Sequence, residues 1–193
     1  MWRWGVEDYS LLTGPFAVQE YIQVLIRNDP SDVQVICERP VEVDLITWQY
    51  EHLRQFVLEL NLLVVSLQPV CTCPKMKGTD QQLFLCASHK PPQECSALDY
   101  MTHTLDHVTA LLLNNKLFAS RHNIPQSGAQ FLVNIVRRLY RFFTHSYFAH
   151  RDTFLEFERT THLCARFSEF SLRFKMMPAD QLCIPSCLFK HRN

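Results

Sequence analysis

The sequence predicts an all-α fold, a bundle of four or five amphipathic helices in one domain. Apolar residues recur at the spacing of a single helix face over several long segments. Only 4 glycines occur, too few for a β-sandwich with many turns. The 193 residues are 47% hydrophobic and include 14 Phe, which is enough for one domain with a large core rich in rings.

The first helix is expected over residues 16–27, after an irregular lead-in over residues 1–15. Asn28-Asp29-Pro30 ends it, because the residue before a proline leaves the helical region. Residues 31–44 are expected to form a loop with some extended structure. The reason is a weak alternation of Val33, Val35 and Cys37 with other residues.

The clearest helix is expected from Thr47 to about Gln68, capped by Asp44 or Thr47 and stopped by Pro69. Its apolar face is Trp48, Leu53, Phe56, Val57, Leu60, Leu63, Val64 and Leu67. Residues 69–98 contain four prolines and read as a long connection with a hairpin around residues 83–86. A connection of this length in a compact domain usually has a function or is tied by a metal.

Three further helices are expected, over residues 99–115, 128–144 with Ser127 as its cap, and 151–176. The middle one should turn inward Phe131, Leu132, Ile135, Val136, Leu139, Phe142 and Phe143. Pro178 is expected to end the ordered core. The tail over residues 179–193 has two cysteines, Cys183 and Cys187, and no periodicity.

Composition narrows the possible functions. The formal net charge is zero, so nothing predicts nucleic acid or an anionic membrane as a partner. No signal-like segment and no apolar run of transmembrane length occurs, so we expect a cytoplasmic protein. In that compartment the 8 cysteines are expected to be metal ligands or buried thiols rather than disulfides. No glycine-rich phosphate loop or nucleophile motif is present.

The main candidate site combines Cys71 and Cys73 with His145 and His150. Two thiolates and two imidazoles are a usual ligand set of structural zinc. His145 and His150 are about 140° apart on a continuous helix, so they converge only if the helix ends between them. The competing interpretation is an exposed thiol pair and two histidines at a polar edge.

A second metal group is conceivable at Cys86, His89 and Cys95, against the simpler interpretation of a buried thiol beside an exposed histidine. His103 and His107 lie one turn apart, with Asp99 and Asp106 nearby. We interpret these four residues as a polar helix edge rather than a metal pair.

Arg137, Arg138 and Arg141 precede the histidine pair and can share one edge of a helix. Guanidinium groups bind phosphate oxygens in a bidentate manner, so this edge is a candidate phosphopeptide site. The alternative is a solvated helix face that also complements the negative end of the helix dipole.

Four blocks closely resemble the striatin-associated, phocein-like class of the Mob family, over about residues 16–178. They are WQYEHLRQFVLELN (48–61), FLCASHK (84–90), ECSALDY (94–100) and RRLYRFFTHSYFAH (137–150). The resemblance implies a four-helix-bundle core with additional helices and a loop or hairpin stapled by structural zinc. It also implies that Arg137, Arg138 and Arg141 match basic residues with which some Mob proteins bind phosphothreonine peptides.

The resemblance further implies a non-catalytic kinase adaptor that joins a striatin-like scaffold, a germinal-centre-type kinase and, indirectly, a type 2A phosphatase. A peripheral association with internal membranes stays open beside the cytoplasmic location. One departure concerns the zinc cysteines, which phocein-like chains usually separate by four residues. The loop here looks about three residues shorter, which strains the geometry at Cys71.

Two rival functions follow from the same residues. If Cys71 is not a ligand, three ligands remain, and a zinc hydrolase with an open coordination position becomes possible. No motif supplies its general base. The other rival is a structural helical subunit that binds no metal.

Overall fold

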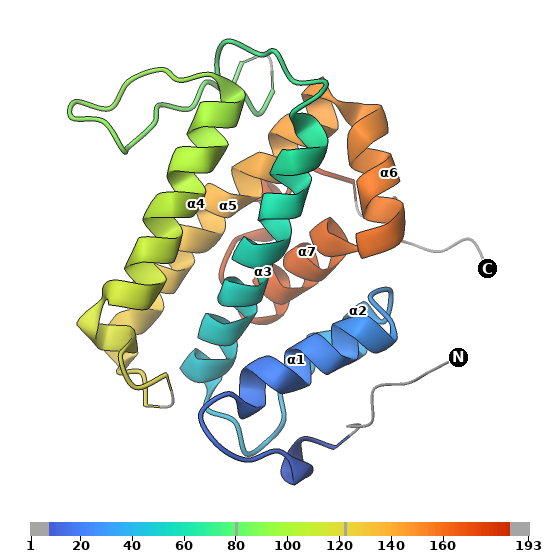
Figure 1. The fold of residues 1–193 in the computed structure, drawn as a ribbon, viewed down its shortest axis with the longest axis vertical. Helices are drawn as coiled ribbons and strands as arrows, with labels where there is room; N and C mark the ends of the chain where they lie inside the picture. Colours follow the sequence, from blue (N-terminus) through green and yellow to red (C-terminus); the bar gives the residue numbers. More distant parts are fainter. Residues whose placement is uncertain (1–7, 80, 122, 186–193) are drawn as a thin grey trace.

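The computed structural model describes residues 8–79, 81–121 and 123–185, and this part of the chain contains seven α-helices and no β-strand (Figure 1). The predicted all-α fold is therefore confirmed. The helices are α1 Ala17–Asn28, α2 Val33–Ile36, α3 Leu45–Leu67, α4 Ala97–Asn114, α5 Ala129–Ala149, α6 Arg151–Thr161 and α7 Leu163–Arg173. Short 3-10 turns lie at Tyr9–Leu11, Lys116–Phe118, Gln126–Gly128 and Ala179–Gln181.

The central element is α3, which packs against α1, α4, α5, α6 and α7. The apolar face expected from the sequence is buried along its whole length. The helix begins where the Asp44 carboxylate accepts hydrogen bonds from the N–H groups of Ile46 and Thr47, both at 3.0 Å. Of the two caps considered, Asp44 is therefore the one used.

The weak strand pattern at residues 33–37 proved misleading, because Val33–Ile36 forms the short helix α2. The Asp32 carboxylate accepts a hydrogen bond from the Val35 N–H at 3.2 Å, which caps the turn. Ile36 is buried and α2 packs against α7. A local cap and one buried side chain thus outweigh a brief β-branched alternation.

The predicted start of α5 was also wrong in detail. Ser127 lies in a 3-10 turn and α5 begins at Ala129 without a side-chain cap. Phe131, expected to face inward, is 40% exposed. At its other end α5 continues to Ala149, beyond the expected residue 144, because the continuous stretch 142–147 is buried against its neighbours.

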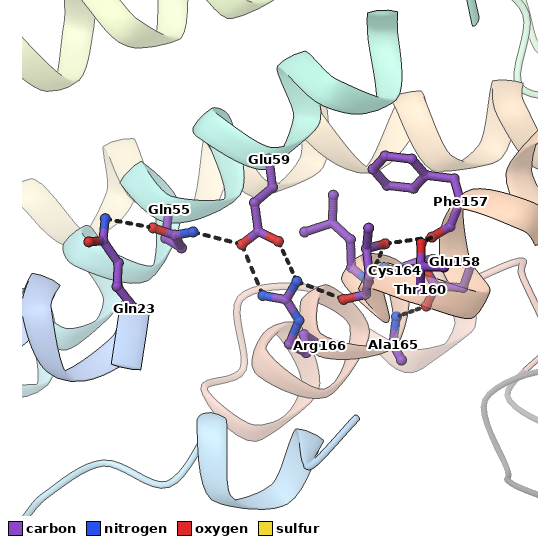
Figure 2. A network of polar contacts seen from close by, with 11 residues as sticks. Gln23, Gln55, Glu59, Phe157, Glu158, Thr160, Cys164, Ala165 and Arg166 are labelled. Carbon is purple, nitrogen blue, oxygen red and sulfur yellow. Dashed lines mark hydrogen bonds and ion pairs between the residues drawn. The ribbon is translucent and has the colours of Figure 1, made fainter. Parts of the chain in front are cut away.

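The helix expected over residues 151–176 is broken into α6 and α7 at His162, which adopts the left-handed conformation with φ 49°. The Glu158 carboxylate accepts hydrogen bonds from the N–H groups of Cys164 and Ala165, each at 2.8 Å (Figure 2). Glu158 therefore caps the start of α7 from the preceding helix. Apolar periodicity continues through the break, so it conceals the change of direction.

The connection between α3 and α4 contains two short chain reversals instead of one hairpin around residues 83–86. Isolated antiparallel bridges join Lys77 to Leu83 and Cys86 to Gln93. Residues 83–86 therefore link the two reversals. Both reversals lie at the end of the bundle where α5 meets α6 (Figure 1).

Past Pro178 the described chain returns to the bundle, where Ile184 is buried and its N–H donates to the Tyr140 hydroxyl at 3.2 Å. Cys183 is exposed, and Cys187 lies outside the described residues. Among the helices that the structure describes, none has the length and apolar character needed to cross a bilayer.

A polar network joins α1, α3 and α7 within the bundle (Figure 2). Gln23 donates to Gln55 at 3.3 Å, and Gln55 donates to Glu59 at 2.9 Å. The Arg166 guanidinium binds both carboxylate oxygens of Glu59, and its Nη2 also donates to the Thr161 carbonyl at 2.9 Å. The Arg166 side chain is 1% exposed and that of Glu59 is 14% exposed, so this ion pair is shielded from water.

We expect Glu59→Leu to lower the free energy of unfolding by about 3–5 kcal/mol, because it leaves the buried Arg166 charge without its partner. The double variant Glu59→Leu, Arg166→Met removes both charges and should cost clearly less than the single variant. Urea unfolding of the three proteins measures both values. A single-variant loss below about 1 kcal/mol, as for an exposed pair, would contradict this assignment.

His52 is a second buried polar group on α3, packed against Trp48, Phe56 and Phe170. Burial, aided by the nearby Arg166 charge, lowers the pKa of His52 from 6.5 to about 3. The imidazole is therefore neutral in the folded protein at neutral pH, while in the unfolded chain it gains a proton below about pH 6.5.

Because the folded-state pKa of His52 is depressed, the titration of this residue costs no folding stability above pH 6.5. As the pH falls from 6.5 toward 3, stability is lost, because the unfolded chain binds a proton at His52 that the folded protein does not. We expect His52→Phe, which removes the titration, to gain stability relative to wild type by up to about 1.4 kcal/mol per pH unit in that window. Urea unfolding at pH 7, 6 and 5 measures the difference. Parallel pH profiles of the two proteins would show that His52 is not buried in its neutral form.

Candidate metal centre

Four residues from distant parts of the chain converge at one end of the bundle. The ligand atoms of Cys71, Cys73, His145 and His150 all lie within 4.8 Å of one another. Cys71 Sγ is 3.6 Å from His145 Nε2, and Cys73 Sγ is 3.4 Å from His150 Nε2. The structure thus brings together the full set that the sequence singled out.

These separations match the edges of a zinc tetrahedron. Zn–S bonds of about 2.3 Å and Zn–N bonds of about 2.0 Å place a sulfur and a nitrogen about 3.5 Å apart. Both measured sulfur–nitrogen distances fall within a few tenths of an ångström of that value. Cys71 meets the distance as well as Cys73 does, so the shortened loop does not move it out of reach.

The two cysteines are positioned by the ends of two core helices. The Cys71 N–H donates to the Leu67 carbonyl at 2.8 Å, one turn past the end of α3. The Cys73 carbonyl accepts a hydrogen bond from the N–H of Ala97 at 3.0 Å, at the first residue of α4. The thiol pair is therefore anchored on both sides by backbone contacts.

The two histidines converge because α5 ends between them. His145 lies within α5, whereas His150 follows its last residue and has φ −138° and ψ 52°, outside the helical region. The two ring centroids are 5.4 Å apart. This is the arrangement that the five-residue spacing required, with one histidine near the end of a helix and the other at the junction with α6.

A backbone contact orients the His145 ring. Its Nδ1 lies 2.7 Å from the Lys77 carbonyl oxygen, so Nδ1 carries the proton and Nε2 presents its lone pair toward Cys71. Burial lowers the pKa of His145 and, to a lesser extent, the neighbouring His150 acts in the same direction. Burial also lowers the pKa of His150. Both rings are thus kept in the neutral form that a metal ligand needs.

The four residues differ in burial, because Cys73 and His150 are half-buried and Cys73 borders a surface cavity that His145 also lines. Cys71 is 5% exposed and His145 is 1% exposed. Two thiols and two imidazoles whose ligand atoms lie within 4.8 Å of one another could bind a metal ion, and four protein ligands are the usual number in structural zinc sites. The arrangement is thus suited to cross-linking the α3–α4 connection to the α5–α6 junction.

The second group suspected from the sequence is also brought together. Cys86, His89 and Cys95 converge, and a fourth residue, His103 on α4, joins them with all four ligand atoms within 4.8 Å. The sequence interpretation missed His103, which it assigned to a polar helix edge. The one feature of the sequence that could have indicated His103 as a ligand is its position, two turns into the helix that begins shortly after Cys95.

The three arginines are not equivalent. Arg138 and Arg141 line a small pocket together with Leu85, Ala87, Ser88, Tyr100, Thr104 and His107. Arg141 donates to the Tyr100 hydroxyl at 2.5 Å and its guanidinium lies 4.5 Å from the centroid of the Phe84 ring. Arg137 is exposed and is not among the residues that line this pocket.

Comparison with known proteins gives consistent matches. The sequence profile described as the Mob1/phocein family matches residues 25–184. MOB kinase activator-like 4 of Drosophila melanogaster is 48% identical over 186 residues, covering 95% of this chain and 83% of the relative. MOB-like protein phocein of Caenorhabditis elegans is 43% identical over 186 residues with the same coverage.

A more distant relative, MOB kinase activator-like 3 of Drosophila melanogaster, is 26% identical over 178 residues, which is 86% of this chain and 80% of the relative. The family profile spans all the helices from α2 to α7 and both Cys/His groups. The chain belongs to the Mob1/phocein family.

Proposed function

We propose that this protein is a non-catalytic adaptor whose docking surfaces are fixed by a structural zinc ion. The observation that carries the proposal is the family match over residues 25–184, with a relative named as a kinase activator-like protein at 48% identity. A protein that recruits a kinase needs a rigid surface rather than an open active site. The group of Cys71, Cys73, His145 and His150 supplies four candidate ligands for a structural ion at the end of the bundle, which is consistent with that need.

Zinc is the metal that best suits Cys71, Cys73, His145 and His150. Two thiolates with two neutral imidazoles in a tetrahedral arrangement favour zinc over magnesium or calcium, which prefer oxygen ligands. Bound there, zinc joins the α3–α4 connection to the junction of α5 and α6. The proposed role of the zinc ion is to restrain residues 69–79, because this segment contains no helix or strand.

A zinc hydrolase is the rival function, and it requires an open coordination position with a base beside it. The position of Cys71, with Sγ 3.6 Å from His145 Nε2, favours four protein ligands and therefore a closed site. Metal-dependent turnover of a model ester or phosphoester by the purified protein would reverse this preference.

The partners proposed here are those implied by the resemblance to phocein-like Mob proteins. They are a striatin-like scaffold, a germinal-centre-type kinase and, through the scaffold, a type 2A phosphatase. Assembly would take place in the cytoplasm, with peripheral association with internal membranes as a further possibility. Co-purification with a striatin-like scaffold tests this assignment, and a chain that binds neither scaffold nor kinase would refute it.

The pocket formed by Arg138 and Arg141 is the proposed docking point for a phosphorylated segment of a kinase. Arg141 is held by Tyr100 and Phe84, which fixes its guanidinium beside the pocket. Arg138 is half-buried and lines the same pocket from the preceding turn of α5. Two guanidinium groups a turn apart can contact one phosphate from two directions.

We expect His145→Ala to lose one equivalent of zinc per chain relative to wild type and to lower the melting temperature by at least about 5 °C, because metal binding and folding are coupled. His107→Ala, a change of the same type outside this group, is the matched control. Elemental analysis and thermal unfolding on the same samples provide the two readouts. An unchanged zinc-to-protein ratio in His145→Ala would defeat the ligand assignment.

We expect Arg138→Glu to weaken binding of a phosphothreonine peptide by at least about tenfold, because it replaces a phosphate contact with a repulsive charge. Arg141→Glu should act similarly. Arg137→Glu makes the same charge change outside the pocket and should have a smaller effect. Fluorescence anisotropy with phosphorylated and unphosphorylated forms of one kinase peptide measures this. Equal affinity of wild type for both forms would remove the phosphate role.

A further inference from the structure

The pocket that contains Arg138 and Arg141 has a second wall on α4. Tyr100, Thr104 and His107 line it, and their spacing of four and three residues places them on one face of that helix. Because α4 packs against α5, this face lies opposite the two arginines. A group that enters the pocket therefore meets side chains from both helices.

The lining of the pocket carries positive charge without a compensating acid. None of its eight lining residues is Asp or Glu. Within the part of the chain that the structure describes, Arg138 forms no ion pair and no hydrogen bond. Arg141 contacts only the neutral groups of Tyr100 and Phe84. Two guanidinium charges without a carboxylate partner favour an anion as the occupant of the pocket.

Thr104 places a buried hydroxyl group in the α4 wall. The residue is 8% exposed, and its hydroxyl forms no hydrogen bond with any residue that the structure describes. A buried hydroxyl without a partner costs free energy of folding. Valine has nearly the same shape and avoids that cost. The hydroxyl is therefore better explained by a ligand that it binds than by the stability of the fold.

The Tyr100 hydroxyl also has a hydrogen to donate. It accepts a hydrogen bond from Arg141 Nη1 at 2.5 Å, which leaves its own proton free, and no acceptor for that proton occurs among the described residues. Tyr100 is 2% exposed, so its position is fixed by packing. His107 is exposed and adds an imidazole at the outer end of the same wall.

Residues 85–88 of the α3–α4 connection form the third side of the pocket. Leu85 and Ala87 contribute apolar side chains. Ser88 Oγ donates to the His103 carbonyl at 3.5 Å, which ties this side to α4. An apolar side limits the access of water to the donors on the two helices, and hydrogen bonds to an anion are stronger where water is excluded.

We propose that Tyr100, Thr104 and His107 donate hydrogen bonds to the bound phosphate from the side opposite the arginines, and that this two-sided contact selects phosphate over carboxylate. The inference rests on the proposed phosphopeptide function and deepens it. A phosphate presents three acceptor oxygens in a tetrahedral array, so donors on both helices can each reach one. The two oxygens of a carboxylate lie in one plane, and binding the guanidinium groups leaves the α4 donors without an acceptor.

The test uses one labelled peptide of a germinal-centre-type kinase, made with threonine, phosphothreonine or glutamate at the same position. Fluorescence anisotropy measures the affinity of the full-length protein for each form. Wild type should bind the phosphorylated form at least about tenfold more tightly than either of the other two. The glutamate form should bind no better than the threonine form by more than about threefold, because its carboxylate engages one wall only.

Thr104→Val should lower the affinity for the phosphorylated peptide by about tenfold, because it removes one hydrogen bond to a charged group. It should leave the affinities for the threonine and glutamate forms unchanged. Thr104→Ser, which restores the hydroxyl, should recover most of the loss. His107→Ala should act in the same direction as Thr104→Val, with a smaller effect because His107 is exposed. Thr102→Val, the same change at an exposed position of α4 outside the pocket, is the matched control.

Thermal unfolding of the same variants separates binding from folding. Because the Thr104 hydroxyl has no partner among the described residues, Thr104→Val should keep or raise the melting temperature while it lowers the affinity for phosphate. A lower melting temperature together with wild-type affinity would show that the hydroxyl serves the fold, which overturns its role as a phosphate donor.

Two binding results would also overturn the inference. Thr104→Val and His107→Ala could bind the phosphorylated peptide as tightly as wild type while Arg138→Glu does not, which removes α4 from the site and leaves the proposed function intact. Wild type could bind the glutamate and phosphorylated forms equally, which removes the selectivity. Equal affinity for the threonine and phosphothreonine forms would instead refute the proposed phosphopeptide function, and the inference with it.

Discussion

The structure depends most on the meeting of the α3–α4 connection with the α5–α6 junction at Cys71, Cys73, His145 and His150. Each core helix begins or ends close to this point. α3 ends before Cys71, α4 begins after the loop, and α5 gives way to α6 at His150. A single ion at the proposed site would therefore restrain four helices relative to one another, because Cys71, Cys73 and His150 are each joined by a backbone hydrogen bond to the end of a helix and His145 lies within α5.

The helical bundle and the α3–α4 connection are stabilised in different ways. The bundle is held by a buried core and by the Glu59–Arg166 ion pair, which need no metal. The α3–α4 connection has two isolated bridges and contributes a few residues, among them Met76 and Cys86, to the core. Under the proposed coordination, a metal ion would add a cross-link between this connection and the α5–α6 junction. The arginine pocket lies where the two parts meet, because Ala87 and Ser88 belong to the connection and Arg138 and Arg141 belong to α5.

Much of this could be predicted from the sequence, for identifiable physical reasons. The helical spacing from Trp48 to Leu67 placed α3, and the five-residue gap between His145 and His150 required a helix end between them, which the structure has. The rest depended on contacts that a linear pattern does not contain. The break at His162 relies on Glu158 capping the next helix, and α2 relies on a cap by Asp32. His103 was missed because its partners lie in a loop whose path the sequence does not reveal.

The most direct test of the central claim is hydrogen exchange of the wild-type protein before and after removal of metal by a strong chelator. Metal loss should speed exchange in residues 69–79 and at the α5–α6 junction together, while the centre of α3 stays protected. The reappearance of protection when zinc alone is restored would complete the agreement. A metal-free protein with the same protection at both segments as the untreated protein would contradict the account.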